Sequence, residues 1–266
     1  MAARELLSAR QALARTGRFG AGARIESRLA ATPARTTWLV RRSGERFVLR
    51  VDGPLSVALG LDRRTEWLWQ RLAWRHGLAP EPVLLRTGRT ACLVSRFAPG
   101  RTWTPADLRD ADRVEQLAQR LSALHALPLP ATAADDLGER IAHYGRAAKS
   151  AAMRTLAQQA AMLWRASGRG GLALCHRDPL AANVAGRRPP LLIDWEYAGP
   201  GDPAFDLAAV LDVLPAGVGR RFLSAYAASG APGVLDRLVV ARQLYVAVEA
   251  LWQAVMRASS GDVPGR

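Results

Sequence analysis

Three oxygen-bearing side chains, Asp178, Asn183 and Asp194, follow one another at a spacing that suits phosphoryl transfer. Asp178 lies in the sequence HRD that begins at His176, Asn183 comes five residues later, and Asp194 ends the apolar run LLI. Phosphoryl transfer needs a carboxylate that orients the attacking hydroxyl and receives its proton, and oxygen ligands that hold Mg²⁺ on the nucleotide phosphates. Because Mg²⁺ keeps several waters, one Asn and one Asp are enough protein ligands.

Each of these residues alone has a simpler structural interpretation. Asp178 precedes a proline and suits a turn, Asn183 suits a cap, and Asp194 suits the end of a buried strand. Their joint order and spacing, with apolar runs on both sides, favour the chemical interpretation.

The surrounding pattern predicts a strand-rich first part and a helix-rich second part, and therefore an α+β fold. The expected strands are 24–30, 36–41, 46–51, 82–86 and 91–97, with a helix at 61–76 and a tight turn at Ser43-Gly44. After the break at Ala98-Pro99-Gly100, helices are expected at 111–126, 137–164 (one or two), 203–213, 217–229 and 234–257, with short β segments near 172–175 and 190–194.

Composition excludes several classes of protein. The 266 residues are 49% hydrophobic, which rules out a disordered chain, and two cysteines are too few for a disulfide framework. The net charge of +14 comes from arginines scattered along the chain, so we expect no nucleic-acid partner. The first residues predict an amphipathic helix instead of a signal peptide, and no apolar run is long enough to span a membrane. We expect a cytoplasmic monomer or homodimer.

Two segments resemble the motifs of the aminoglycoside phosphotransferase and choline kinase superfamily. They are LCHRDPLAANV (174–184) and LLIDWEYAGPGDPAFDLA (191–208), and the second is most similar to bacterial choline and thiamine kinases. LSALHALP (121–128) resembles a helix end that is frequent in the group. The resemblance implies a protein-kinase-like two-lobed fold, with a small antiparallel-sheet lobe with one main helix (1–98) and a larger, mostly helical catalytic and acceptor-binding lobe (99–266).

The resemblance also implies roles for individual residues. Asp178 matches the catalytic base, and Asn183 and Asp194 match the two Mg²⁺ ligands. His176 matches a histidine that supports the catalytic loop, and Asp206 matches an acid that anchors this loop through backbone N–H groups. Asp202, close to Asp206, ranks lower because it also suits a helix N-terminus.

ATP is the expected co-substrate, and the first lobe is expected to bind it. Arg50 stands where kinases commonly have a phosphate-binding lysine, and Glu66 is its expected ion-pair partner, with Glu81 as a weaker candidate. The segment 30–37 lacks the glycines of a phosphate loop, so the hydroxyls of Thr36 and Thr37 and the charge of Arg35 are expected to serve instead. Adenine is expected near Ser95 and Phe97.

The acceptor site is the least defined. Tyr245, Glu249 and Trp252 lie at i, i+4 and i+7, on one helix face, where aromatic rings and a carboxylate suit an amine. Ordinary core packing is the simpler explanation of the two aromatic residues, because aromatic residues at helical spacing usually pack in the core. Three further residues, Trp195, Glu196 and Tyr197, follow the metal aspartate and are candidate acceptor contacts, and Glu196 is also a candidate metal contact.

The resulting hypothesis is an ATP-dependent kinase for an amino-alcohol-like acceptor such as choline, ethanolamine or thiamine. Two alternatives stay open. An aminoglycoside phosphotransferase would need several carboxylates in its acceptor site, which Asp135, Asp136, Glu139 and Asp202 offer. A catalytically silent, pseudokinase-like protein would fit the missing glycines and the arginine at position 50. A protein kinase is disfavoured, because Asp194-Trp195-Glu196 stands where a protein kinase has D-F-G, and no A-P-E motif follows it.

Overall fold

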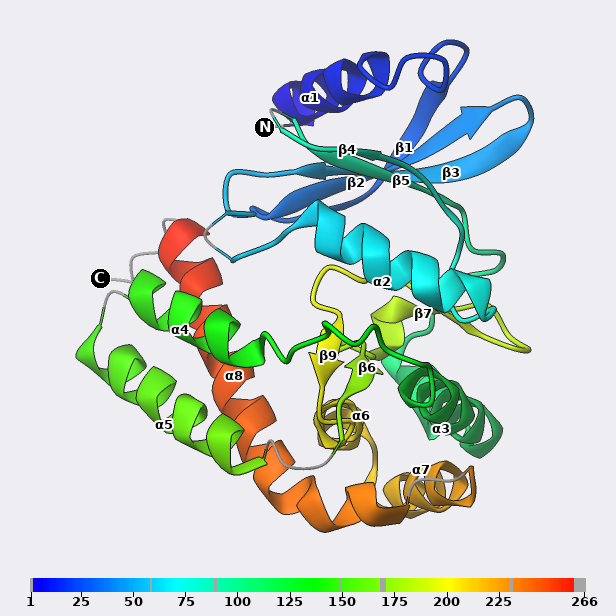
Figure 1. Cartoon of the computed structure of the whole chain (residues 1–266). Coiled ribbons are helices and arrows are strands. Elements are labelled where there is room, and N and C mark those ends of the chain that lie inside the picture. Colours follow the sequence, from blue (N-terminus) through cyan, green and yellow to red (C-terminus); the bar gives the residue numbers. More distant parts are fainter. Residues whose placement is uncertain are drawn as a thin grey trace.

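The computed structural model describes residues 2–57, 59–88, 90–148, 150–167, 171–229 and 232–260. An antiparallel sheet with the order β1-β2-β3-β5-β4 forms the first lobe, and helices dominate the second (Figure 1). The strands of this sheet are β1 (Arg24–Ala31), β2 (Arg35–Arg42), β3 (Glu45–Asp52), β4 (Pro82–Arg86) and β5 (Cys92–Arg96). The helices are α1 (Ala2–Ala14), α2 (Arg63–Arg75), α3 (Ala111–His125), α4 (Leu137–Ala147), α5 (Ala151–Ser167), α6 (Ala204–Val213), α7 (Ala216–Ala228) and α8 (Leu238–Ser260).

The sheet carries one helix on each face (Figure 1). In β3, Phe47, Leu49 and Val51 alternate toward one buried face, where they pack with residues of α1. On α2, Trp69 and Ala73 join the core of the helical lobe instead. The helix α2 therefore connects the sheet with the catalytic lobe.

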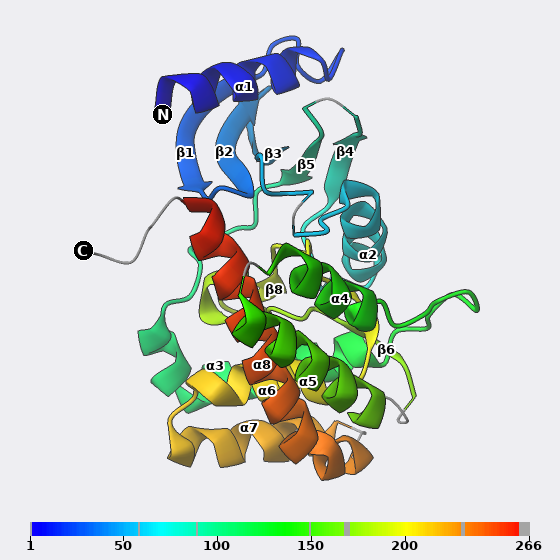
Figure 2. The ribbon, with the colours of Figure 1, turned by 90° about the vertical axis from the view of Figure 1, so that its left-hand side faces the viewer.

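The helical lobe holds two short antiparallel strand pairs that carry the motifs at 174–184 and 191–208. Strand β6 (Ala173–Cys175) pairs with β9 (Gly199–Gly201), and β7 (Val184–Ala185) pairs with β8 (Leu191–Leu192). Helices α3 and α7 pack together, as do α5 with α8 and α6 with α8 (Figure 2). These packed helices surround the two strand pairs and fix the loops between their strands.

The α+β arrangement of a sheet lobe and a helical lobe is confirmed, and the first-lobe elements match the expected ranges within two residues. The 137–164 segment forms two helices. The sequence analysis missed β7 and β9 because two or three residues are too short for a periodic signal. The division at residue 98 remains a prediction.

One helix, Gly233–Ala258, is long and apolar enough by composition to cross a membrane. It packs against α4, α5 and α6, and 33% of its most apolar stretch is buried inside the fold. A core helix of a globular domain meets the same criterion of length and composition.

Candidate active site

Asp206, at the start of α6, anchors the loop that follows β6. It is fully buried, and its carboxylate accepts hydrogen bonds from the backbone N–H groups of His176 and Arg177, both at 2.7 Å, and contacts His125 Nε2 at 3.1 Å. Burial favours the neutral acid, but these partners hold the pKa of Asp206 below its ordinary value. The carboxylate therefore holds the loop by charge-assisted hydrogen bonds, as the resemblance implied, while Asp202 pairs with Arg237 at 2.7 Å.

His176 supports the next turn of the chain. Its ring is buried, Nε2 lies 3.0 Å from the carbonyl oxygen of Ile193, and burial lowers its pKa, so the ring is neutral. The ring of Trp195 packs edge-on against it at 4.8 Å between centroids. Trp195 is fully buried and donates its indole N–H to Leu192 at 2.9 Å. The prediction that Trp195 contacts the acceptor is therefore wrong, because its ring is used in the core.

Asp178 and Asn183 contact each other across the loop. The Nδ2 atom of Asn183 donates to the carbonyl oxygen of Asp178 at 2.9 Å and to Asp178 Oδ2 at 2.7 Å. This orientation leaves the Oδ1 atom of Asn183 as a ligand oxygen. Burial and the charge of Asp194 raise the pKa of Asp178 to about 8, and a raised pKa makes its carboxylate a better proton acceptor.

Asp194 lies opposite this loop with a left-handed backbone, at φ 70°. Its Oδ1 accepts from Arg50 at 3.0 Å, and its Oδ2 pairs with Arg35. Burial opposes ionisation of Asp194, but the two arginines lower its pKa, so it is a carboxylate. Asn183 and Asp194 line one cavity, and an amide oxygen with a carboxylate is a donor set that fits Mg²⁺.

This cavity, of about 510 Å³, lies between the sheet lobe and the two short strand pairs of the helical lobe, and we call it the nucleotide cavity. The residues that the sequence analysis predicted for nucleotide binding and that do line it are Arg35, Thr37, Arg50, Ser95 and Phe97. Glu66 lies behind the wall, where it forms the predicted ion pair with Arg50 at 2.7 Å. Glu81 pairs with Arg96 instead.

Two positions of the sheet lobe differ from expectation. Thr36 does not line the cavity, because successive residues of β2 point to opposite faces and Thr37, opposite Arg50, takes the inner one. Gln70, which the sequence analysis did not identify, accepts from Arg50 at 3.1 Å and donates to Ser95 Oγ at 2.9 Å. Its position on α2 gave no signal, since its partners are distant in sequence.

Glu196 belongs to an ion-pair cluster between the lobes. Its carboxylate pairs with Arg35 and lies 3.7 Å from Arg63. It does not line the acceptor cavity described next, so the structure does not bring it together with the other predicted acceptor residues. Arg35 and Arg63 of the sheet lobe attract this carboxylate by their opposite charge and hold it between the lobes.

A second cavity, of about 190 Å³, lies on the other side of Asp178, and we call it the acceptor cavity. Four residues predicted for the acceptor line it together with Asp178, namely Tyr197, Tyr245, Glu249 and Trp252. The indole of Trp252 donates to the hydroxyl of Tyr197 at 2.8 Å, which fixes both rings. Two lining residues from α4, Arg140 and Tyr144, were missed, although their i, i+4 spacing places them on one helix face.

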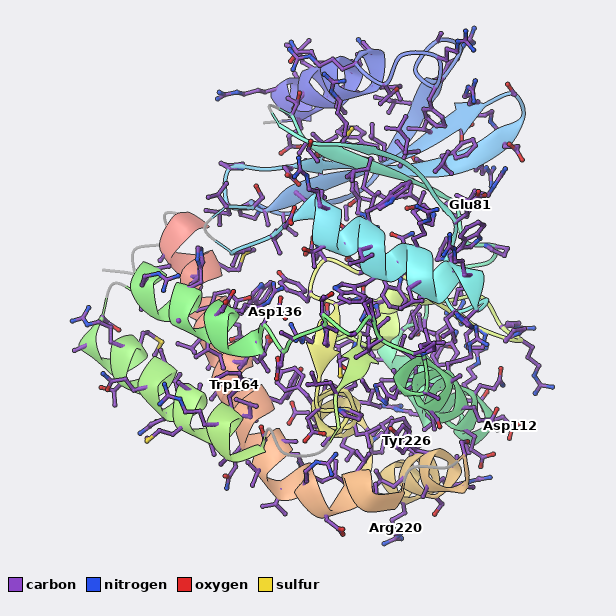
Figure 3. The ribbon with its side chains drawn as sticks, in the orientation of Figure 1. Glu81, Asp112, Asp136, Trp164, Arg220 and Tyr226 are labelled. Atoms are coloured by element: carbon purple, nitrogen blue, oxygen red, sulfur yellow. The ribbon has the colours of Figure 1, made fainter. Side chains whose placement is uncertain are left out.

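The acids considered for an aminoglycoside site do not line this cavity. Asp135 pairs with Arg177 at 3.1 Å and accepts from Trp164, and Asp136 pairs with Arg177 at 2.6 Å. Figure 3 labels Asp136 where the chain enters α4 and Trp164 on α5. The carboxylates of Asp135 and Asp136 therefore stabilise Arg177 in the loop and are not available to a polycationic acceptor.

The match to a family model covers residues 28–239 and identifies the phosphotransferase enzyme family. The LicA protein of Haemophilus influenzae is 25% identical over 183 residues, which cover 65% of this chain and 68% of LicA. Among solved structures, LicA in complex with AMP has a TM-score of 0.77 at 18% identity and covers 97% of this chain, with 92% of its own chain covered. A choline/ethanolamine kinase family protein from Mesorhizobium loti has a TM-score of 0.74 at 22% identity, covering 98% and 89%.

At these identities the two solved structures show the shared kinase-like fold. The family match extends over most of the chain and includes both short strand pairs, β6–β9 and β7–β8. The chain therefore belongs to the phosphotransferase enzyme family.

Proposed function

We propose that this chain transfers the γ-phosphoryl group of ATP to the hydroxyl of a small amine-bearing alcohol of the choline and ethanolamine type. The observation that carries this proposal is the contact between two cavities. Asp178 lines the acceptor cavity, Asn183 and Asp194 line the nucleotide cavity, and Asn183 Nδ2 lies 2.7 Å from Asp178 Oδ2. A hydroxyl beside Asp178 would therefore face a phosphate held beside Asn183.

The residues divide the work of the reaction. Asp178 orients the attacking hydroxyl and accepts its proton, and Asn183 keeps that carboxylate in place. Arg50, supported by Glu66, offers a positive charge to the phosphates. Bound Mg²⁺, held by Asn183 and Asp194, would neutralise the charge that develops on the phosphate oxygens. For it to bind, Asp194 must share or release its contacts with the arginines of the sheet lobe.

The acceptor cavity supports an amine on the acceptor. Tyr245 and Trp252 offer aromatic rings, and Glu249 offers a carboxylate from the same face of α8. Among the described residues, the only hydrogen bond to the Glu249 carboxylate comes from Gln253, at 2.8 Å, so the second oxygen of Glu249 is available. One such carboxylate suits a single amine better than an aminoglycoside, which carries several. The location that goes with an ATP-dependent reaction is the cytoplasm.

The experiment that tests the proposal measures Mg²⁺-dependent ADP release with choline, ethanolamine, thiamine and kanamycin. Asp178→Asn is expected to lower kcat by about 10²- to 10⁴-fold with the fold intact. Asp212→Asn, an exposed aspartate on α6, is the matched control and should keep full activity. Turnover by Asp178→Asn at the wild-type rate would refute the proposal. ATP binding by wild type without turnover of any acceptor would favour the pseudokinase-like alternative.

A further inference from the structure

Arg140, on α4, places a guanidinium group at the wall of the acceptor cavity. The residue is only 8% exposed, and its guanidinium carbon lies 5.3 Å from the ring centroid of Tyr197. Among the residues that the structure describes, neither Nε nor Nη1 of Arg140 has a hydrogen-bond acceptor. A buried cation therefore lines the pocket with much of its donor capacity unused.

Arg140 has one long ion pair, with a carboxylate that is shared with a second arginine. The nearest carboxylate oxygen, Asp136 Oδ2, is 3.8 Å from Nη2, beyond hydrogen-bond distance, and the other oxygen of Asp136 is held by Arg177 at 2.6 Å. The hydroxyl of Tyr144 also lies beside the guanidinium, but it carries no charge. The contact with the Tyr197 ring supplies only a modest attraction.

A buried guanidinium with so few partners lowers the stability of the fold unless a bound anion pairs with it. An arginine cannot lose its proton in a protein, so burial does not neutralise it as it would a lysine. A buried charge without a partner destabilises the fold. A guanidinium at a cavity wall offers a planar set of N–H donors that matches the geometry of a carboxylate.

We propose that Arg140 forms an anion subsite in the acceptor cavity, so that the acceptor alcohol carries a carboxylate as well as an amine. This inference rests on the proposed function and narrows its substrate class to zwitterionic amino alcohols. In this arrangement Glu249 and the rings of Tyr245 and Trp252 hold the amine, Arg140 holds the carboxylate, and Asp178 faces the hydroxyl. The cavity, with these charges of both signs on its wall, matches a small molecule with charges of both signs.

The turnover experiment compares serine with ethanolamine, which differ only in the carboxylate, and carnitine with choline, where the carboxylate comes on an added CH₂ group and the hydroxyl becomes secondary. Wild type is expected to favour the carboxylate-bearing member of at least one pair by roughly 10- to 100-fold in kcat/KM, the size of a hydrogen-bonded ionic contact. Arg140→Met should remove that preference and Arg140→Lys should restore part of it. Equal preference in wild type and Arg140→Met would overturn the inference while leaving the kinase activity in place.

A binding experiment separates this inference from the proposed reaction. Calorimetry measures glycine betaine, which has the carboxylate but no hydroxyl, against choline. Betaine should bind wild type more tightly and should lose roughly 10-fold or more in affinity in Arg140→Met. Failure of betaine to bind wild type, or equal binding to both proteins, would overturn the inference. This outcome does not depend on phosphoryl transfer, so it is distinct from failure of the kinase assay.

Thermal unfolding provides a third readout. Without ligand, Arg140→Met should unfold at a higher temperature than wild type, because it removes a buried charge whose ion pair with Asp136, at 3.8 Å, is too long for a hydrogen bond. Arg146→Met, which removes an exposed arginine from the same helix, should leave both the unfolding temperature and the acceptor preference unchanged. A clear fall in the unfolding temperature of Arg140→Met would show that the fold itself satisfies the guanidinium and would overturn the proposal.

Discussion

Replacing Asp206 by Asn should destabilise the catalytic loop far more than the size of the change suggests. Both carboxylate oxygens accept hydrogen bonds from the backbone N–H groups of His176 and Arg177, at 2.7 Å, and His125 adds a third contact. An amide keeps only one acceptor oxygen, so its NH₂ group must face a backbone donor. The change therefore removes a buried charge and leaves one donor without a partner.

The magnitude follows from these contacts. A hydrogen bond to a charged group contributes about 1.5–3 kcal/mol, and breaking a buried charged network typically costs about 3–5 kcal/mol. We expect Asp206→Asn to lower the free energy of unfolding by about 3–5 kcal/mol. Because many domains have only about 5–15 kcal/mol in total, the variant should be measured at low temperature.

Urea unfolding followed by tryptophan fluorescence measures this difference. Asp202→Asn is the matched control, because Asp202 lies four residues away and is also paired, with Arg237 at 2.7 Å. Its Oδ1 accepts from the N–H of Ala204 at 2.9 Å, and an amide oxygen can keep that bond. We expect a loss of about 1–2 kcal/mol there. Equal losses in the two variants would refute the assignment of Asp206 as the loop anchor.

The pH dependence gives an independent check. The pKa of Asp206 is lower in the folded protein than its ordinary value of 3.8, so its contribution is fully present above that pH. It is lost as the pH falls through the lower, folded-state pKa. The stability difference between wild type and Asp206→Asn should shrink as the pH falls below about 4. A difference that grows on acidification would contradict this assignment.

Three further changes test the two cavities. Glu66→Gln removes the buried partner of Arg50, 2.7 Å away, and should raise the KM for ATP about 10-fold and lower the free energy of unfolding by about 2–4 kcal/mol; an unchanged KM would mean that Arg50 does not need the pair. Asn183→Ala removes a donor to Asp178 and a ligand oxygen, and should lower kcat by about 10²-fold or more and raise the Mg²⁺ concentration needed for half-maximal rate. Trp252→Leu should raise the KM for the amine-bearing acceptor about 10-fold and leave the KM for ATP unchanged; equal changes in both would place the tryptophan outside the acceptor site.

The sequence by itself determined the elements and the chemical class. The alternation in β3 and the helical spacing in α2, α3 and α8 are local patterns, and local hydrogen bonding and burial of one face decide them. The motifs at 174–184 and 191–208 were likewise readable, because phosphoryl transfer demands particular side chains at short spacing. A hairpin brings these two segments together wherever the rest of the fold lies.

Only the tertiary structure decided which side chains face which cavity. Arg35 meets Asp194 across 159 positions of sequence, and no local pattern announces such a partner. Trp195 and Tyr197 are two residues apart, yet one ring packs in the core on His176 and the other lines the acceptor cavity. Nothing in the local sequence distinguishes Arg140 from an ordinary helix-surface arginine, and only the packing of α4 near α8 shows that it is buried. The physical reason is that burial and charge pairing depend on residues brought together from distant segments, which spacing along the chain does not encode.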